Sequence, residues 1–100
     1  MREALEEAIV TRDDGSLLIA GWLPVDELAE SLGVTLPEKR PYETAAGMLV
    51  NAFGKLPAVG ERIAVQNWQF EIIDLDGRRI DKVLAIKRPT ARQKMNFEQR

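Results

Sequence analysis

The stretch that decides the fold is residues 42–63, YETAAGMLVNAFGKLPAVGERI, where helix, turn and strand signals follow one another with little slack. Thr44 can cap the first turn of a helix by accepting a hydrogen bond from an unpaired amide, and Gly54 can adopt the left-handed conformation that ends one. Between them, apolar side chains recur at the spacing of one helical face. These residues are Ala45, Met48, Leu49, Ala52 and Phe53. The stretch therefore predicts a short helix that covers a sheet.

A glycine stands inside this predicted helix, where it weakens helix formation by about 1 kcal/mol relative to alanine. Gly47 therefore indicates that another group approaches the helix closely. Tight packing against a neighbouring element is the ordinary reason for such a glycine. Contact with a ligand or a partner is the alternative.

The composition limits the classes of function. With 45% hydrophobic residues among 100, the chain can bury the core of one domain without disulfides. A net charge of -2 gives no field that would favour nucleic acid or an anionic membrane surface. The sequence has no cysteine and no histidine, which removes nearly every familiar zinc site, thiol nucleophile and Ser/His triad. An enzyme would have to work through carboxylates, lysine or a bound cofactor.

The sequence shows no pattern typical of a membrane span or a secretory signal. The apolar runs are far shorter than a bilayer span, and residues 1–10, MREALEEAIV, carry acids where a secretory signal needs a basic start. We therefore expect a soluble, untargeted chain.

The N-terminal half predicts a hairpin followed by a second helix. Residues 8–12 and 16–20 are β-type runs joined by a turn that ends in Asp-Gly, a pair that tolerates positive φ. Pro24 suits the first position of the helix, and Gly33 follows its last turn. The helical stripe comprises Val25, Leu28, Ala29 and Leu32. Trp22, beside Pro24, is expected to plug the core, with an exposed partner contact as the alternative.

The C-terminal half predicts a three-stranded antiparallel meander over residues 61–66, 68–74 and 79–87, with tight turns at 66–67 and 76–77. In its middle strand Trp68, Phe70 and Ile72 point to one face, which the helices should cover. Between the helices, residues 34–41 read as an extended, solvent-facing connector.

Together these signals predict an α+β fold. An antiparallel sheet, made of the N-terminal hairpin and the C-terminal meander, is covered on one face by two short helices. The expected organisation is an N-terminal extension at 1–7, one domain at 8–88 and a flexible tail at 89–100.

The charged residues of the last hairpin offer two candidate sites. Asp74, Asp76 and Asp81 fit ordinary turn chemistry better than a calcium loop, because their spacing fails the EF-hand pattern. Arg78 and Arg79 lead a locally basic run that either binds an anion or stays solvated and paired with cross-strand acids such as Glu71. No catalytic constellation emerges from the residues alone.

The order of the motifs is more specific than any one of them. They run DGS (14–16), GWLPVDEL (21–28), YETAAG (42–47), LPAVGE (56–61), FEI (70–72) and DGRRI (76–80). This order resembles the CorC/HlyC transporter-associated domain, found at the C-terminus of hemolysin-like, magnesium and cobalt efflux-type membrane proteins. The similarity runs from about residue 7 to residue 88.

The resemblance implies a parent protein with a transmembrane domain and a pair of CBS domains that bind adenine nucleotides, followed by this domain on the cytoplasmic face of the plasma (inner) membrane. It implies a fold similar to a subdomain of certain FAD-binding proteins. The expected function is a non-catalytic regulatory or interaction domain whose partners are the parent's CBS and transmembrane domains, with a homodimer through an open sheet edge as a further expectation and no nucleic acid. The alternative is a small-ligand module for FAD or an adenine nucleotide, for which the candidate residues are the glycines of close approach Gly47 and Gly60 and the basic residues Arg78 and Arg79.

Overall fold

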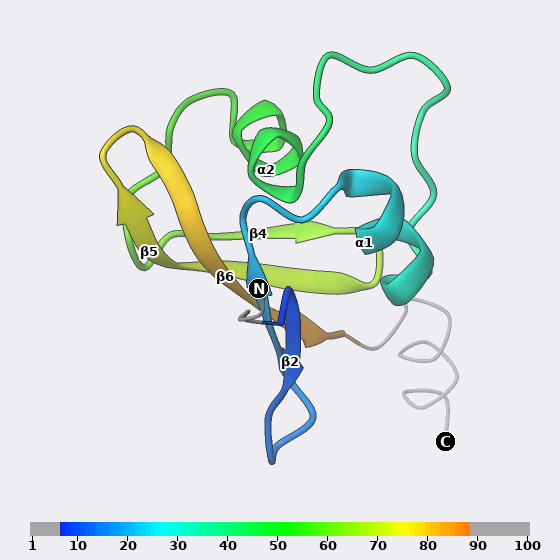
Figure 1. The fold of residues 1–100 in the computed structure, drawn as a ribbon, viewed down its shortest axis with the longest axis vertical. Coiled ribbons are helices and arrows are strands. Elements are labelled where there is room, and N and C mark those ends of the chain that lie inside the picture. Colours follow the sequence, from blue (N-terminus) through cyan, green and yellow to red (C-terminus); the bar gives the residue numbers. More distant parts are fainter. Residues whose placement is uncertain (1–6, 89–100) are drawn as a thin grey trace, which may run out of the picture.

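The structure, a computed structural model, describes residues 7–88. Its elements in chain order are β2 (Ile9–Thr11), β3 (Leu17–Ala20), α1 (Val25–Leu32), α2 (Ala45–Phe53), β4 (Arg62–Val65), β5 (Trp68–Asp76) and β6 (Arg79–Lys87). The strands form one five-stranded antiparallel sheet in the order β2-β3-β6-β5-β4 (Figure 1). The predicted α+β class, with hairpin, meander and two helices, is therefore confirmed. The expected tail, and all but the last residue of the expected extension, lie outside the described residues.

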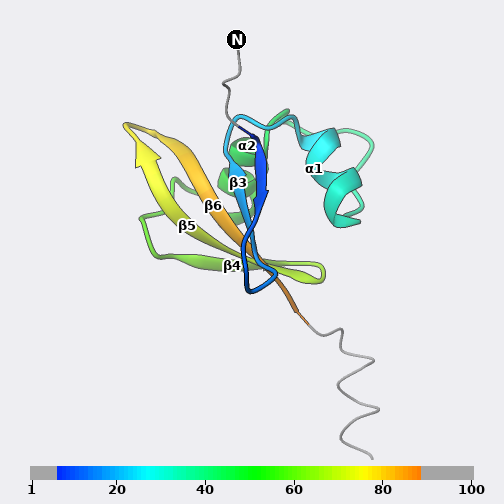
Figure 2. The ribbon, with the colours of Figure 1, turned by 60° about the horizontal axis from the view of Figure 1, so that its bottom comes forward.

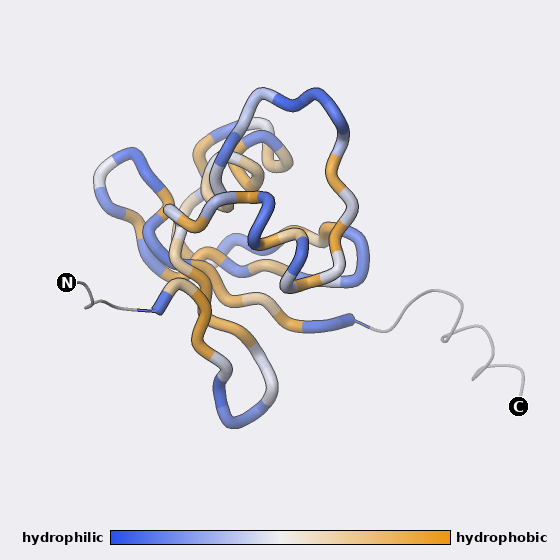
Figure 3. Tube along the Cα trace, turned by 45° about the vertical axis from the view of Figure 1, so that its right-hand side comes forward, coloured by the Kyte–Doolittle hydropathy of each residue, from blue (hydrophilic) through white to orange (hydrophobic). Residues whose placement is uncertain are grey.

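The helices lie over one face of the sheet, and the core fills the space between them. Ile19, Val83 and Ile72 stand side by side on β3, β6 and β5, and all three are fully buried. Trp68 and Phe70 share this face, as the alternation in the sequence predicts. Figure 2 shows the twist of β5 and β6 with both helices to one side of them, and Figure 3 shows the hydrophilic segments gathered at the turns and the connector.

The helix α2 begins and ends where the sequence predicts. The Thr44 hydroxyl accepts a hydrogen bond from the Gly47 amide at 3.1 Å, and Gly54 takes a left-handed conformation with φ 78°. The buried face is shorter than predicted, since Ala52 is exposed. Phe53, the other predicted residue of the last turn, is partly buried against the core.

The start of α1 differs from the prediction by one residue. Pro24 is the N-cap, not the first helical residue, because its ψ of 136° is extended. This extended backbone pairs with Thr44 in an isolated β-bridge, and the Val25 amide donates to the carbonyl of Glu43 at 2.8 Å. The two helix starts are thus tied together. Gly33 ends α1 in a left-handed conformation, as predicted.

The two tryptophans have opposite environments. The prediction that Trp22 plugs the core is wrong, because its side chain is 55% exposed. Its neighbours Gly21 and Leu23 are both buried, and Trp22 lies in the turn closed by the hydrogen bond from the Leu23 amide to the carbonyl of Ala20. Trp68 is the buried one, at 8% exposure, and its indole Nε1–H donates to the carbonyl of Leu32 at 2.8 Å.

The connector and the last turn also differ in detail from the sequence-based prediction. Val34 at the start of the connector is buried, so only the remainder of the segment is largely solvent-facing. The last hairpin has Gly77 and Arg78 as its two loop residues, one position later than predicted, with Gly77 at φ 63°. No helix of residues 7–88 is long and apolar enough to cross a membrane.

Candidate functional site

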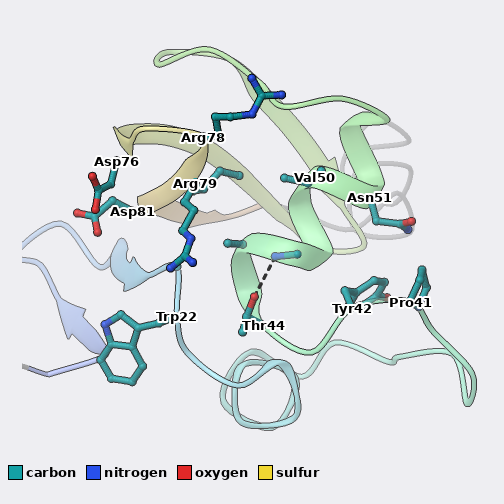
Figure 4. A pocket seen from close by; sticks show the side chains of 14 residues that line it. Trp22, Pro41, Tyr42, Thr44, Val50, Asn51, Asp76, Arg78, Arg79 and Asp81 are labelled. Atoms are coloured by element: carbon teal, nitrogen blue, oxygen red, sulfur yellow. Dashed lines mark hydrogen bonds between the residues drawn. The ribbon is translucent and has the colours of Figure 1, made fainter.

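A cavity of about 800 Å³ opens between the solvent side of α2 and the tip of the β5–β6 hairpin (Figure 4). The turn after β3 supplies Gly21 and Trp22, and the segment before α2 supplies Tyr42. The hairpin contributes Arg78 and Arg79. The volume lies within the usual range for small-molecule sites.

The floor of the cavity depends on Gly21, a residue that the sequence had marked only as part of a turn. A Cβ on Gly21 would lie 2.0 Å from the carbonyl oxygen of Ile80. The Gly21 amide donates to the carbonyl of Asp81 at 2.8 Å, and its carbonyl accepts from the amide of Ala46 at 2.9 Å. Gly21 thus joins the hairpin to α2 by backbone contacts, and no short-range signal in the sequence could have revealed this.

Gly47 makes a close contact with a side chain of its own chain. A Cβ on Gly47 would lie 2.9 Å from the Cβ of Tyr42, so the glycine makes room for the tyrosine. This contact supports the packing interpretation. Gly47 also lines the cavity, and its contact with a ligand stays a prediction.

Gly60 lies apart from the other candidate residues. It precedes β4, does not line the cavity, and would have nothing within 4 Å of an added Cβ. Its φ of 94°, and not a close approach, is what requires glycine there. The structure therefore brings Gly47, Arg78 and Arg79 together and leaves Gly60 out.

The two arginines of the hairpin are exposed, and within residues 7–88 neither guanidinium has an ion pair. The cross-strand acid Glu71 pairs instead with Arg62 of β4, at 3.4 Å. Asp81 is bonded to Lys82 at 3.3 Å. An anion that enters the cavity would find guanidinium groups that hold no carboxylate of the described chain.

The N-terminus of α2 offers no further donors to such an anion. The amide of Ala45 donates to the carbonyl of Leu23 at 2.8 Å, and the amide of Ala46 is committed to Gly21. The amides of Gly47 and Met48 donate to the hydroxyl and the carbonyl of Thr44. Anion recognition in this cavity therefore depends on arginine side chains, in contrast to the usual phosphate site at a helix start.

The carboxyl groups with shifted pKa values lie outside the cavity. Hydrogen bonds from the hydroxyl and the amide of Ser16 lower the pKa of Asp14. A hydrogen bond from the Ala58 amide, with the Lys55 ammonium beside it, lowers the pKa of Glu61. Both acids stabilise turns. Across the described part of the chain, no three acidic residues gather closely enough to hold a metal ion.

The fold is a small α+β module with a cavity beside its last hairpin. The chain belongs to the CorC_HlyC family, the transporter associated domain, whose family model matches residues 10–89. The match confirms the resemblance to this family that the order of the sequence motifs indicated.

Solved structures of the same domain are similar over most of the chain. The CorC_HlyC domain of a Xylella fastidiosa Temecula1 hemolysin is 48% identical, with a TM-score of 0.74, and the match covers 82% of this chain and 96% of that one. The same Xylella domain, solved in complex with Mg++ and Mn++, is 47% identical, with a TM-score of 0.75 over 83% of this chain and all of that one. The domain from Nitrosomonas europaea is 30% identical, with a TM-score of 0.76, over 82% of this chain and 98% of that one.

Curated relatives are much longer than this chain. The UPF0053 protein sll0260 of Synechocystis is 39% identical over 90 residues, which are 87% of this chain and 20% of that protein. The polyamine export protein of Escherichia coli K12 is 34% identical over 86 residues, or 85% of this chain and 19% of that protein. The chain thus spans about a fifth of the length of these relatives.

Proposed function

We propose that this chain is the non-catalytic regulatory domain of a longer, hemolysin-like membrane transport protein, on its cytoplasmic side and next to CBS domains. The observation that carries the proposal is the match to about a fifth of an export protein, within a family described as transporter associated. Transport itself belongs to the rest of the longer protein. The domain passes the nucleotide occupancy or the dimer geometry of the CBS pair to the transport part.

The proposed cargo is a small cation. The sequence resemblance implies divalent ions such as magnesium or cobalt, and the Xylella domain was solved with Mg++ and Mn++. The name of the relatives at 33% and 34% identity states polyamine export. Both kinds of cargo are positively charged, so we infer a cation transporter without assigning the ion.

The uncovered face of the sheet is the proposed contact with the remaining four fifths of the longer protein. One row of residues crosses all five strands on this face, as the pairing register places it. The row is charged at one end and apolar at the other, and its members are Arg62, Glu71, Leu84, Leu18 and Val10. Ile86 extends the apolar end and is 38% exposed. An apolar group on a solvent-facing sheet is typical of an interface.

Lysine substitutions in the longer protein test this contact. Ile86→Lys places a charge on the proposed interface. The substitution should weaken the contact, because burying an ammonium group without a partner is costly. We expect altered cargo flux with normal expression. Val59→Lys is the matched control, since Val59 is also exposed, at 58%, but lies in the loop before β4. Equal flux in the two variants and the parent would contradict the proposed contact.

The second candidate function is a small-ligand module for FAD or an adenine nucleotide. It is favoured by one observation, that Gly47, Arg78 and Arg79 line a single cavity. A ligand that binds only the folded state raises the melting temperature of the isolated chain. No shift at saturating FAD or ATP would eliminate this function.

A homodimer remains a proposal as well, with the outer strands β2 and β4 as the edges available for pairing. Native mass spectrometry of the 100-residue chain reports bound ligand and subunit number together. A monomer at all concentrations would contradict the dimer.

A further inference from the structure

We propose that Trp22 and Arg79 act as one recognition unit for a small molecule that joins a flat aromatic ring to an anionic group. The ring stacks on the indole, and the anion binds the guanidinium. This inference rests on the small-ligand function proposed above and assigns its ligand class and its contact residues.

Trp22 is held in position to receive a ring. Its side chain lines the cavity and is 55% exposed, although tryptophan ordinarily buries most of its surface. The backbone on each side is fixed, because the Gly21 amide donates to Asp81 and the Leu23 amide donates to Ala20 at 3.2 Å. The indole is therefore a flat surface exposed to solvent on a fixed backbone.

Arg79 supplies the charge next to that surface. Its side chain extends from the hairpin toward Trp22, whereas the side chain of Arg78 points away from the tryptophan (Figure 4). A guanidinium presents a planar fork of donors that fits the oxygens of a phosphate or a carboxylate. Within residues 7–88 this fork has no carboxylate partner. Arg79 is thus available to an anion whose attached ring lies on Trp22.

The rest of the cavity fits this assignment. The amides at the start of α2 are all committed to carbonyl or hydroxyl oxygens, so the anion beside the ring depends on Arg79, the arginine that extends toward Trp22. Small residues, among them Gly21, Ala46 and Gly47, also line the cavity.

The carboxylate of Asp76 should lower the affinity of the cavity for an anionic ligand. Asp76 is the direct cross-strand partner of Arg79 and lines the same cavity. Its carboxylate repels an anion bound in the same cavity. Replacing it with a neutral residue, Asp76→Asn, should therefore strengthen binding of an anionic ligand by about two- to fivefold.

Titration of the whole 100-residue chain with ATP tests the proposal. The fluorescence of the exposed Trp22 should be quenched on stacking, while that of the buried Trp68 should change little. Adenosine carries the ring without the anion, and tripolyphosphate carries the anion without the ring. We expect each of these to bind at least about tenfold more weakly than ATP, because each makes only one of the two contacts. FAD is a second probe, followed by the anisotropy of its flavin emission.

Two arginine variants distinguish a specific contact of Arg79 with the ligand from a general effect of positive charge. Arg79→Gln should weaken ATP binding by about tenfold or more, since it removes a charge-assisted hydrogen bond. Arg78→Gln changes the net charge equally and should weaken binding by less than about threefold. Trp22→Leu, measured by calorimetry, should weaken ATP binding by about fivefold or more and leave the binding of tripolyphosphate unchanged. Circular dichroism checks that each variant folds.

Three results would overturn the inference. Tripolyphosphate that binds as tightly as ATP would exclude the ring contact. Equal losses in the Arg78 and Arg79 variants, or none in either, would exclude the assigned unit while leaving a ligand function elsewhere on the domain. No saturable binding of ATP or FAD would remove both the inference and the small-ligand function.

Discussion

Gly21 and Ile80 meet backbone against backbone, with the carbonyl oxygen of Ile80 2.0 Å from the position that a Cβ of Gly21 would occupy. This contact fixes the distance between the β5–β6 hairpin and the turn that carries Trp22. Gly21→Ala should destabilise the domain by about 3 kcal/mol or more, because backbone atoms cannot move aside as a flexible side chain does. Urea unfolding of the 100-residue chain measures the loss.

The control for this prediction is Gly33→Ala. An added Cβ at Gly33 meets nothing within 4 Å, so only its φ of 74° opposes the substitution. The expected cost there is about 1 kcal/mol. Equal losses at the two glycines would show that the contact with Ile80 is not what demands glycine at Gly21.

Gly47 and Tyr42 form a pair whose coupling a double-mutant cycle can measure. In the parent chain Gly47→Ala should destabilise, because the new Cβ would meet the Cβ of Tyr42 at 2.9 Å. In a Tyr42→Gly background the same change should stabilise by up to about 1 kcal/mol, since alanine favours the helix. The measurement is the unfolding free energy of the four proteins, and an unchanged sign in the second background would exclude the packing interpretation.

Thr44 caps α2 and also supplies the carbonyl that receives the Met48 amide. Thr44→Ala should cost about 1 kcal/mol of stability, because it leaves the Gly47 amide without its partner. Thr44→Ser retains the hydroxyl and should keep the stability that the cap provides. Denaturation midpoints compare the two, and equal losses would mean that the methyl group of Thr44, and not the cap, is what matters.

Acid should weaken the turn before β4. The pKa of Glu61 is lowered below its ordinary 4.5 in the folded chain by the Ala58 amide and by Lys55. A lowered folded-state pKa means that the unfolded state binds the proton more tightly, so this stabilisation is complete above about pH 4.5 and is lost as the pH falls through the folded-state pKa. Glu61→Gln should flatten the pH dependence of the urea midpoint between about pH 6 and about pH 3. A slope as steep as that of the parent would assign the acid sensitivity to other groups, such as Asp14.

Local signals were enough to predict the frame of the fold. The cap at Thr44, the stop at Gly54 and the alternation through Phe70 each depend on neighbours within a few residues, and all three appear in the structure. The outward direction of Trp22 depends instead on the contact between Gly21 and the distant β6, which no short pattern encodes. The cavity was predicted only in part for the same reason, because its lining comes from segments that are distant in the sequence.

The basic run left an anion site at Arg78 and Arg79 open as one of two interpretations, and both residues line the cavity. Gly60 was included as a glycine of close approach, a role that is indistinguishable in sequence from a positive φ in a turn. Trp22 was missed as a cavity residue because its burial was inferred from its size.

The central claim is that this domain regulates transport carried out by the rest of a longer protein. Flux of radiolabelled cation through membrane vesicles, with and without residues 8–88 in the longer protein, tests it most directly. We predict that the shortened protein inserts normally and still moves its cargo, but with an altered rate or nucleotide dependence. Identical flux and identical nucleotide response in the two proteins would contradict the claim.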